Sequence, residues 1–380
     1  MKIAIGNPGV GDPLMPFELA TTTEKALNSA SFSGKWTVLI FCPSEQVPNC
    51  AATLDALRDA HQQFITRHVD VYGISLAAPD AQKTFANEHQ LPFPLASDAQ
   101  LQVSTAHGAL RPKEDGQSTA EPDKLQLTAL RRTMLLGPDA RIVRIYDNLA
   151  PEEHVSRLLA DIDALANREP PRRVVSHAPV LLIPNALPAE LCKRLIQIWS
   201  EQGNVDSGFM RQVEGKTVGM YDYSHKIRRD HFLTAGPELD TLKRFISSRV
   251  IPSMRTAFNY EVSRFEDFRI ACYDSARGGY FRPHRDNTTE GTAHRRFAMS
   301  LLLNDDYEGG TLRFPEYGLH EYRPDAGSAV VFSCSLLHEA TDVTRGQRFV
   351  LLSFFYGEKE AKIREEYNKR TGGEYRAAKS

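Results

Sequence analysis

The sequence predicts two domains, an α/β layer domain followed by a mainly-β sandwich or barrel with flanking helices. The chain has 380 residues, which is more than one hydrophobic core usually serves. Strand-like and helix-like segments alternate up to about residue 166, a pattern typical of α/β layers. After about residue 258 the chain becomes rich in short strand candidates that are separated by Gly, Pro, Asp and Asn.

The first domain is expected over residues 1–167. Its candidate strands are short apolar runs, and they lie at 36–42, 69–75, 133–136 and 141–146. Its candidate helices lie at 50–64, near 79–89 and at 151–166. Leu54 and Leu57 recur at helical spacing in the first of these helices, and Pro151 opens the last one at a first-turn position.

The second domain is expected over residues 178–358. A linker at 168–177 precedes it, because two prolines among charged residues break the helical pattern there. Helix candidates in this domain lie at 188–202 and 238–258, and strand candidates lie at 267–273, 297–303, 310–314, 328–334 and 349–356. We expect the charged segment 359–380 to form a helix followed by a loose tail.

Composition and charge exclude several classes of protein. Charged residues make up 25% of the chain and the formal net charge is −2, so no nucleic-acid partner is expected. Five widely spaced cysteines do not form a disulfide framework and suit a reducing compartment. The chain starts without the apolar core of a secretory signal, and no apolar run approaches the roughly 18 residues that span a bilayer. We expect a cytoplasmic protein without a membrane partner; its oligomeric state stays open, a dimer included.

Two histidines and one aspartate are candidate metal ligands. His284 and Asp286 are two positions apart, and on a strand such neighbours point to the same face. His338 follows the apolar run 328–334. Two imidazoles and one carboxylate form the facial triad that leaves positions open on Fe(II) for an organic chelate and O2. The same donors also suit Zn(II), so a non-catalytic metal-binding module remains an alternative.

Arg348 is the candidate anchor for a dicarboxylic acid. It opens the strand candidate at 349–356, and its planar guanidinium can hold a carboxylate through two hydrogen bonds. An arginine at a strand start is usually a surface ion-pair partner, and an H-x-D triplet alone is common. The joint occurrence of these features in one strand-rich segment favours a metal site beside a carboxylate-binding arginine.

Three segments of the second domain carry a family resemblance. They read YDSARGGYFRPHRD from residue 273, RRFAMSLLLNDDYEGGTLRF from residue 295 and RPDAGSAVVFSCSLLHEATDVTRGQRFVLLSFF from residue 323. Together they resemble the 2-oxoglutarate/Fe(II) oxygenases of the prolyl 4-hydroxylase type. The resemblance implies a double-stranded β-helix, or jelly roll, with His284, Asp286 and His338 on iron and Arg348 on 2-oxoglutarate. Tyr273 would lie beside the co-substrate, although its spacing to His284 is about two residues longer than in the family, and a core aromatic is the alternative.

The same resemblance implies a reaction. Fe(II), 2-oxoglutarate and O2 would act together, with ascorbate as a further cofactor, and succinate and CO2 would be the co-products. The hydroxylated C–H bond would belong to a peptidyl residue, with proline as the first choice, or to a small molecule. Related halogenases lack the carboxylate ligand, so Asp286 favours hydroxylation.

Basic residues crowd this motif. They are Arg277, Arg282, Arg285, Arg295, Arg296 and Arg313. A similar run at residues 225–229 is a candidate for a segment that covers the substrate before the core strands. An exposed basic surface explains them, and so does attraction of 2-oxoglutarate or of an acidic substrate.

Residues 3–147 resemble the peroxiredoxin family, which has a thioredoxin fold. The resemblance lies in FCPSEQVPNC at 41–50, FPLASD at 93–98 and RRTMLLGPDARIVRIYD at 131–147. It implies that Cys50 is the peroxidatic cysteine and that Arg131 stabilises its thiolate. A thiolate at a helix N-terminus is also favoured by the helix dipole. Val47 stands where the family has Thr or Ser, so a hydroxyl that would contact peroxide is missing, and an inert Cys50 in a retained scaffold is the alternative. Cys42 is expected to be a small core residue.

Three functions are therefore weighed. The leading hypothesis is an Fe(II)- and 2-oxoglutarate-dependent dioxygenase whose first domain docks substrate, senses oxidant or guards the iron. The second is a thiol peroxidase acting through Cys50, with a metal-binding β-domain. The third is the non-catalytic metal-binding module.

Overall fold

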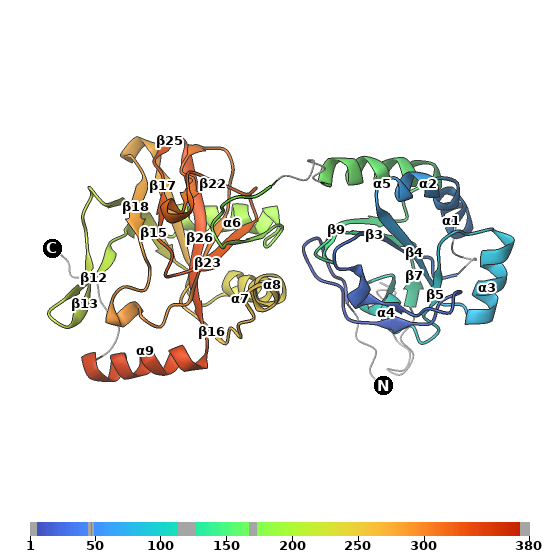
Figure 1. Ribbon diagram of the computed structural model, residues 1–380, viewed down its shortest axis with the longest axis horizontal. Helices are drawn as coiled ribbons and strands as arrows, with labels where there is room; N and C mark the ends of the chain where they lie inside the picture. The colour runs from blue at the N-terminus through green and yellow to red at the C-terminus, as the bar shows by residue number, and fades with distance from the viewer. Residues whose placement is uncertain (1–5, 45–46, 48, 113–126, 167–172, 373–380) are drawn as a thin grey trace. The chain divides into compact units, whose positions relative to one another are not determined.

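The computed structural model describes residues 6–44, 47, 49–112, 127–166 and 173–372. The chain divides into two compact units, Met1–Pro171 and Arg172–Ser380 (Figure 1). Residues 168–172 of the expected linker and the end of the expected tail, from 373, lie outside the described residues. No helix within the described ranges is long and apolar enough to cross a bilayer.

A five-stranded sheet forms the centre of the first unit. Its strands, in sheet order, are β5 (Leu95–Ser97), β4 (Val69–Ser75), β3 (Trp36–Phe41), β8 (Arg132–Leu136) and β9 (Ile142–Asp147). Strands β5, β4 and β3 are parallel, whereas β8 and β9 join antiparallel. The four strands predicted from the sequence are confirmed, and β5 was not predicted.

Helices cover this sheet because its side chains alternate between two apolar faces. Val38 and Ile40 pack with Leu54 of α1, whereas Leu39 and Phe41 belong to a cluster on the other face. The helices are α1 (Cys50–Asp59), α2 (His61–Ile65), α3 (Pro79–Glu88), α4 (Gln102–Ala106) and α5 (Pro151–Leu165). Two small hairpins pair β1 (Glu18–Leu19) with β2 (Leu27–Asn28) and β6 (Leu110–Pro112) with β7 (Leu127–Ala129). The predicted α/β layer is confirmed.

Two predicted helices are each divided in the structure. The helix expected at 50–64 breaks at Ala60, whose φ of −94° and ψ of 3° leave the helical region. The helix expected at 238–258 becomes α7 (Pro237–Phe245), a π-helical turn (Ile246–Val250) and α8 (Ile251–Phe258). Pro252 has no N–H to donate to the preceding turn, so a change of helical geometry before it has a clear cause.

The second unit is built on two antiparallel sheets. The larger runs β10 (Leu181–Ile183), β23 (Ala329–Ser333), β19 (Phe297–Leu302), β26 (Gln347–Tyr356), β17 (Arg269–Asp274), β15 (Arg229–Phe232) and β11 (Val205–Asp206), with β16 (Arg264–Phe265) also on β26. The smaller runs β14 (Lys226–Ile227), β18 (Tyr280–His284), β24 (His338–Ala340), β21 (Leu312–Arg313) and β22 (Glu321–Tyr322). Five of these strands match the candidates from the sequence.

Helices and hairpins complete the second unit. The helices besides α7 and α8 are α6 (Ala189–Glu201) and α9 (Glu358–Thr371). One hairpin joins β12 (Phe209–Val213) to β13 (Lys216–Met220), and β20 (Glu308–Gly309) pairs with β25 (Val343–Arg345). Short 3₁₀ turns lie at Ser29–Phe32 in the first unit and at Ser275–Arg277, Glu290–Thr292 and Pro315–Tyr317 in the second.

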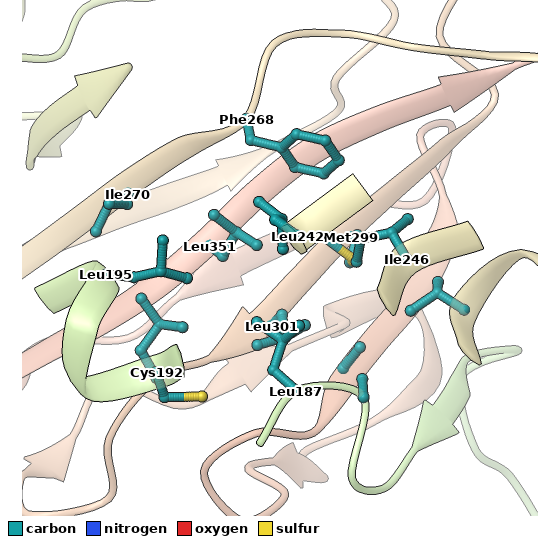
Figure 2. Close-up of a cluster of buried hydrophobic side chains, with 14 of the residues drawn as sticks. Leu187, Cys192, Leu195, Leu242, Ile246, Phe268, Ile270, Met299, Leu301 and Leu351 are labelled. Atoms are coloured by element: carbon teal, nitrogen blue, oxygen red, sulfur yellow. The ribbon is translucent and has the colours of Figure 1, made fainter. Parts of the chain in front are cut away.

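Alternation along β26 and β17 separates the core from the site. Leu351 and Ile270 point toward the helices, where they pack with Leu195 and Leu242 (Figure 2). The intervening residues, such as Val350, form a second cluster that includes side chains of the smaller sheet. Residues of the same parity as Val350 therefore face the space between the two sheets.

Candidate metal centre

Strands β18 and β24 bring the predicted ligands together. The two strands pair so that His284 lies opposite His338, and Asp286 follows β18 by two residues. One ligand atom from each of the three side chains lies within 4.8 Å of the others. Nε2 of His284 is 3.6 Å from Oδ1 of Asp286, and Nε2 of His338 is 3.3 Å from Oδ2. The three side chains together form one set of donor atoms for a single cation.

Backbone contacts orient both imidazole rings. Nδ1 of His284 donates to the carbonyl oxygen of Arg282 at 2.8 Å, and Nδ1 of His338 donates to that of Leu336 at 3.0 Å. With the proton on Nδ1, each Nε2 carries a lone pair toward the centre. Phe281 stacks on His284 with ring centroids 3.4 Å apart, which fixes that ring further.

The protonation states also suit a metal. Burial and the neighbouring charge of His338 lower the pKa of His284 to about 4. Burial raises the pKa of Asp286, but the two imidazoles outweigh it and hold this pKa well below its usual range. At neutral pH the site therefore presents a neutral imidazole at His284 and a carboxylate at Asp286, the states that bind a metal ion.

A cavity of about 310 Å³ opens from this triad between the two sheets. Arg348 lines the cavity from β26 and lies opposite Tyr273 of β17 in the sheet register. Its Cζ is 5.1 Å from the centroid of the Tyr273 ring. Arg348 is only 3% exposed, its Nη2 reaches Ser300 Oγ at 3.4 Å, and its Nε has no hydrogen-bond partner among the described residues. A buried guanidinium so weakly paired is well suited to bind an anion.

The turn before β21 lets Arg348 approach. Gly310 has a φ of +58°, and a Cβ there would lie 3.0 Å from Cδ of Arg348. Gly309, with a φ of +68°, would place a Cβ 2.2 Å from the carbonyl oxygen of Asp342. Glycine is therefore required in this turn for both backbone conformation and space.

The six arginines noted in the sequence are each ion-paired. Their partners are Asp206 for Arg277, Asp342 for Arg282, Glu316 for Arg285, Glu266 for Arg295, Glu360 for Arg296 and Glu339 for Arg313. Only Arg285 and Arg295 of the six line the cavity. Carboxylates from distant parts of the chain thus neutralise the positive charge of these six arginines.

Sequence reasoning missed Arg269 and assigned Lys226 only to a candidate substrate-covering segment; both line the cavity. A signal for Arg269 was available, because it shares its parity with Ala271 and Tyr273 on β17. No comparable signal marks Asp230 and Glu266, whose carboxylates pair with cavity arginines.

The first unit holds a pair of thiols. Cys50 opens α1, and Cys42 follows β3 with its Sγ 3.8 Å from the carbonyl oxygen of Cys50. A hydrogen bond from the Cys42 thiol lowers the pKa of Cys50, burial opposes that shift, and the charge of Arg131 adds to it. Burial raises the pKa of Cys42 well above its usual value. Val47 packs against the apolar cluster of this face. All five cysteines of the chain are buried free thiols.

Comparison with known proteins matches a different family to each unit. The AhpC/TSA family matches residues 10–145, and the 2OG-Fe(II) oxygenase superfamily matches residues 268–356. The chloroplastic peroxiredoxin Q of Populus jackii is 29% identical over 160 residues, which are 42% of this chain and 69% of that protein. The chloroplastic peroxiredoxin Q of Sedum lineare is 27% identical over 151 residues, 40% of this chain and 75% of that protein. A solved structure of Xanthomonas campestris peroxiredoxin Q, 20% identical, covers 41% of this chain and 98% of its own with a TM-score of 0.36. The chain thus joins an N-terminal peroxiredoxin-like domain of the AhpC/TSA family to a C-terminal domain of the 2OG-Fe(II) oxygenase superfamily.

Proposed function

We propose that the C-terminal domain is an Fe(II)- and 2-oxoglutarate-dependent dioxygenase that hydroxylates a C–H bond of a peptidyl residue, with proline as the first choice, or of a small molecule. The observation that supports it most is the convergence of His284, Asp286 and His338 within 4.8 Å in the wall of a cavity that Arg348 also lines. Two sheets that share one apolar cluster suit the double-stranded β-helix expected from the sequence.

Separate groups of residues would bind the metal and the co-substrate. His284, Asp286 and His338 would hold the metal from one side and leave the cavity side free. Arg348 would receive the distal carboxylate of 2-oxoglutarate, with Tyr273 beside it. Iron held there would supply the O2 chemistry that converts 2-oxoglutarate to succinate and CO2 and hydroxylates the substrate. Ascorbate would keep the metal reduced between turnovers. A cytoplasmic location stays a prediction.

Succinate formation tests this proposal. Full-length protein with Fe(II), 2-oxoglutarate and O2 is screened against peptides, amino acids and small metabolites. We expect Fe(II)-dependent succinate from the wild type and none from His284→Ala. The exposed His320, changed to Ala, is the matched control and should leave activity unchanged. Succinate production that persists in His284→Ala would contradict the proposed role of the triad.

A thiol peroxidase activity of the N-terminal domain is the second candidate. It is favoured by the lowered pKa of Cys50, which has a hydrogen bond from Cys42 and the charge of Arg131 beside it. Consumption of hydrogen peroxide with dithiothreitol as reductant is compared between wild type, Cys50→Ser and the control Cys192→Ser, whose thiol is buried in the other unit. Full peroxide consumption by Cys50→Ser would remove this candidate.

A further inference from the structure

The cavity of the C-terminal domain has more positive charge than 2-oxoglutarate needs. Six cationic side chains line it, and they are Lys226, Arg228, Arg269, Arg285, Arg295 and Arg348. The single carboxylate in the lining is Asp286, which the metal would use. Such an excess of buried charge is costly unless anions compensate it.

Three of the six cations have a carboxylate partner from the surrounding structure. Arg228 binds Asp230 with both ends of its guanidinium, at 2.7 and 2.6 Å. Arg295 binds Glu266 in the same way, at 2.7 and 2.9 Å. The remaining pair joins Arg285 to Glu316 at 2.6 Å. These cations are satisfied before any ligand enters.

Lys226 and Arg269 are not satisfied in this way. Nζ of Lys226 donates to two neutral oxygens, Ser207 Oγ at 2.8 Å and the carbonyl oxygen of Gly208 at 2.6 Å. Arg269 reaches the already paired Glu266 only at 3.7 Å, and its Nε has no hydrogen-bond partner among the described residues. Burial is the main reason that the pKa of Lys226 lies well below its usual value, and the charges of Arg228 and, to a smaller extent, Arg269 add to this lowering. Both side chains line the same cavity.

This pair is separate from Arg348. Tyr273 lies opposite Arg348 in the sheet, and Arg269 is four residues earlier on the same strand, about 13 Å along it. The Cζ of Arg269 lies 5.1 Å from the ring centroid of Phe232 and 5.5 Å from that of Phe354, not against Tyr273.

Lys226 lies close to the metal centre. Its Nζ is 4.7 Å from the centroid of the Phe281 ring, the same ring that stacks on His284. A group held by Lys226 would therefore be near the place where a substrate C–H bond must lie. Phe209 and Met210 of the β12–β13 hairpin also line the cavity and add apolar surface.

We infer that Lys226 and Arg269 form a second anion site in the cavity, which binds an oxyanion group of the substrate, a carboxylate or a phosphate, while Arg348 holds 2-oxoglutarate. This rests on the proposed dioxygenase function and narrows its substrate to an acidic one. Arg228 and Arg295 are already paired with Asp230 and Glu266, so they are not the groups that receive this oxyanion.

Anion binding to the loaded protein tests this site. Full-length protein is loaded anaerobically with Fe(II) and saturating 2-oxoglutarate, and inorganic phosphate and acetate are titrated into separate samples by calorimetry. The affinity of each variant for 2-oxoglutarate is measured on the same preparations. We expect the wild type to bind at least one of the two anions, and the preferred anion tells a phosphate from a carboxylate substrate. Arg269→Gln and Lys226→Gln should weaken that binding about tenfold or more and leave the affinity for 2-oxoglutarate nearly unchanged.

Three further variants make the result specific. Arg348→Gln should show the opposite pattern, with 2-oxoglutarate binding weakened about a hundredfold. Arg269→Lys keeps the charge and should recover part of the anion affinity, which separates a binding role from a folding defect. Arg255→Gln, at an exposed arginine, should behave as wild type. Absence of anion binding by loaded wild type, or loss of 2-oxoglutarate affinity in Arg269→Gln, would overturn the second site. A wild type that binds neither Fe(II) nor 2-oxoglutarate would instead overturn the dioxygenase proposal.

Discussion

Arg348 combines deep burial with a weakly paired guanidinium, so its charge is the part of the site most dependent on a ligand. We predict that Arg348→Gln raises the KM for 2-oxoglutarate about a hundredfold, because a charged hydrogen-bond pair is lost, while Fe(II) affinity stays near wild type. Steady-state succinate formation at varied 2-oxoglutarate measures this. The exposed Arg345, paired with Glu308, provides the control Arg345→Gln. An unchanged KM in Arg348→Gln would place the co-substrate elsewhere.

His154 predicts a pH dependence of stability in the N-terminal domain. Burial, with the charge of Arg131, lowers the pKa of His154 from 6.5 to about 4, and its Nε2 contacts Thr133 Oγ1 at 2.9 Å. Below pH 6.5 the unfolded chain takes up a proton that the folded domain does not, so stability should fall as the pH drops toward 4. The loss amounts to about 3 kcal/mol and levels off below that pH.

Urea unfolding at several pH values measures this effect. The chain has two tryptophans, Trp36 and Trp199, one in each unit. In a Trp199→Phe background the fluorescence of Trp36 reports the N-terminal domain. His154→Gln removes the titrating group, so its stability should vary less between pH 6.5 and 4 than that of the parent. An identical slope in both proteins would rule out His154 as the cause.

At the residue scale, the sequence allowed us to predict the metal ligands and the carboxylate-binding arginine, because their residue types recur at a recognisable spacing. His284 and Arg348 lie on strands, where parity decides which face a side chain occupies, whereas Asp286 lies in the turn after β18 and not on the strand as expected. The charge state of the cavity could not be predicted, since it depends on Asp230 and Glu266 folding against particular arginines. A run of basic residues in the sequence does not reveal whether carboxylates from distant parts of the chain will neutralise it in the fold.

The turn between β20 and β21 is the element most closely tied to the co-substrate site. In Gly310→Ala the new Cβ would meet Cδ of Arg348 at 3.0 Å and Cγ2 of Val343 at 2.7 Å. We predict that this change displaces Arg348 and weakens 2-oxoglutarate binding about tenfold, in addition to a backbone cost of about 1–2 kcal/mol.

Gly203→Ala is the matched control for this element. Gly203 also has a positive φ, +86°, but a Cβ there has no neighbour within 4 Å. The control should lose stability through the same backbone strain and keep its affinity for 2-oxoglutarate, measured by calorimetry with Fe(II) under anaerobic conditions. Equal affinities in the two variants would show that the turn does not position Arg348.

Long elements with clear periodicity were predictable, and short ones were not. Strands β3, β17 and β26 were found because their apolar residues form continuous runs. Strands of two residues, such as β11 and β14, carry no periodic signal and exist only because a neighbouring strand pairs with them. The break at Ala60 is likewise invisible in the sequence, which has no proline or glycine at that point.

At the scale of the whole molecule, each unit has its own core, so a ligand should stabilise only the unit that binds it. Anaerobic 2-oxoglutarate at a hundred times its dissociation constant should add about 3 kcal/mol to the stability of the Fe(II)-loaded C-terminal domain. Trp199 fluorescence in a Trp36→Phe background should report that shift, whereas Trp36 fluorescence in Trp199→Phe should not move. A shared shift would mean that the two units unfold as one.

The visible spectrum of the anaerobic protein is the sharpest test of the metal centre, because it observes metal and co-substrate together without a substrate. Addition of 2-oxoglutarate to the Fe(II)-loaded wild type should produce the weak charge-transfer band of a chelated 2-oxo acid. His338→Ala should lack this band, and the control His320→Ala should keep it. A wild type without the band, or His338→Ala with an unchanged one, would contradict a metal centre built from His284, Asp286 and His338.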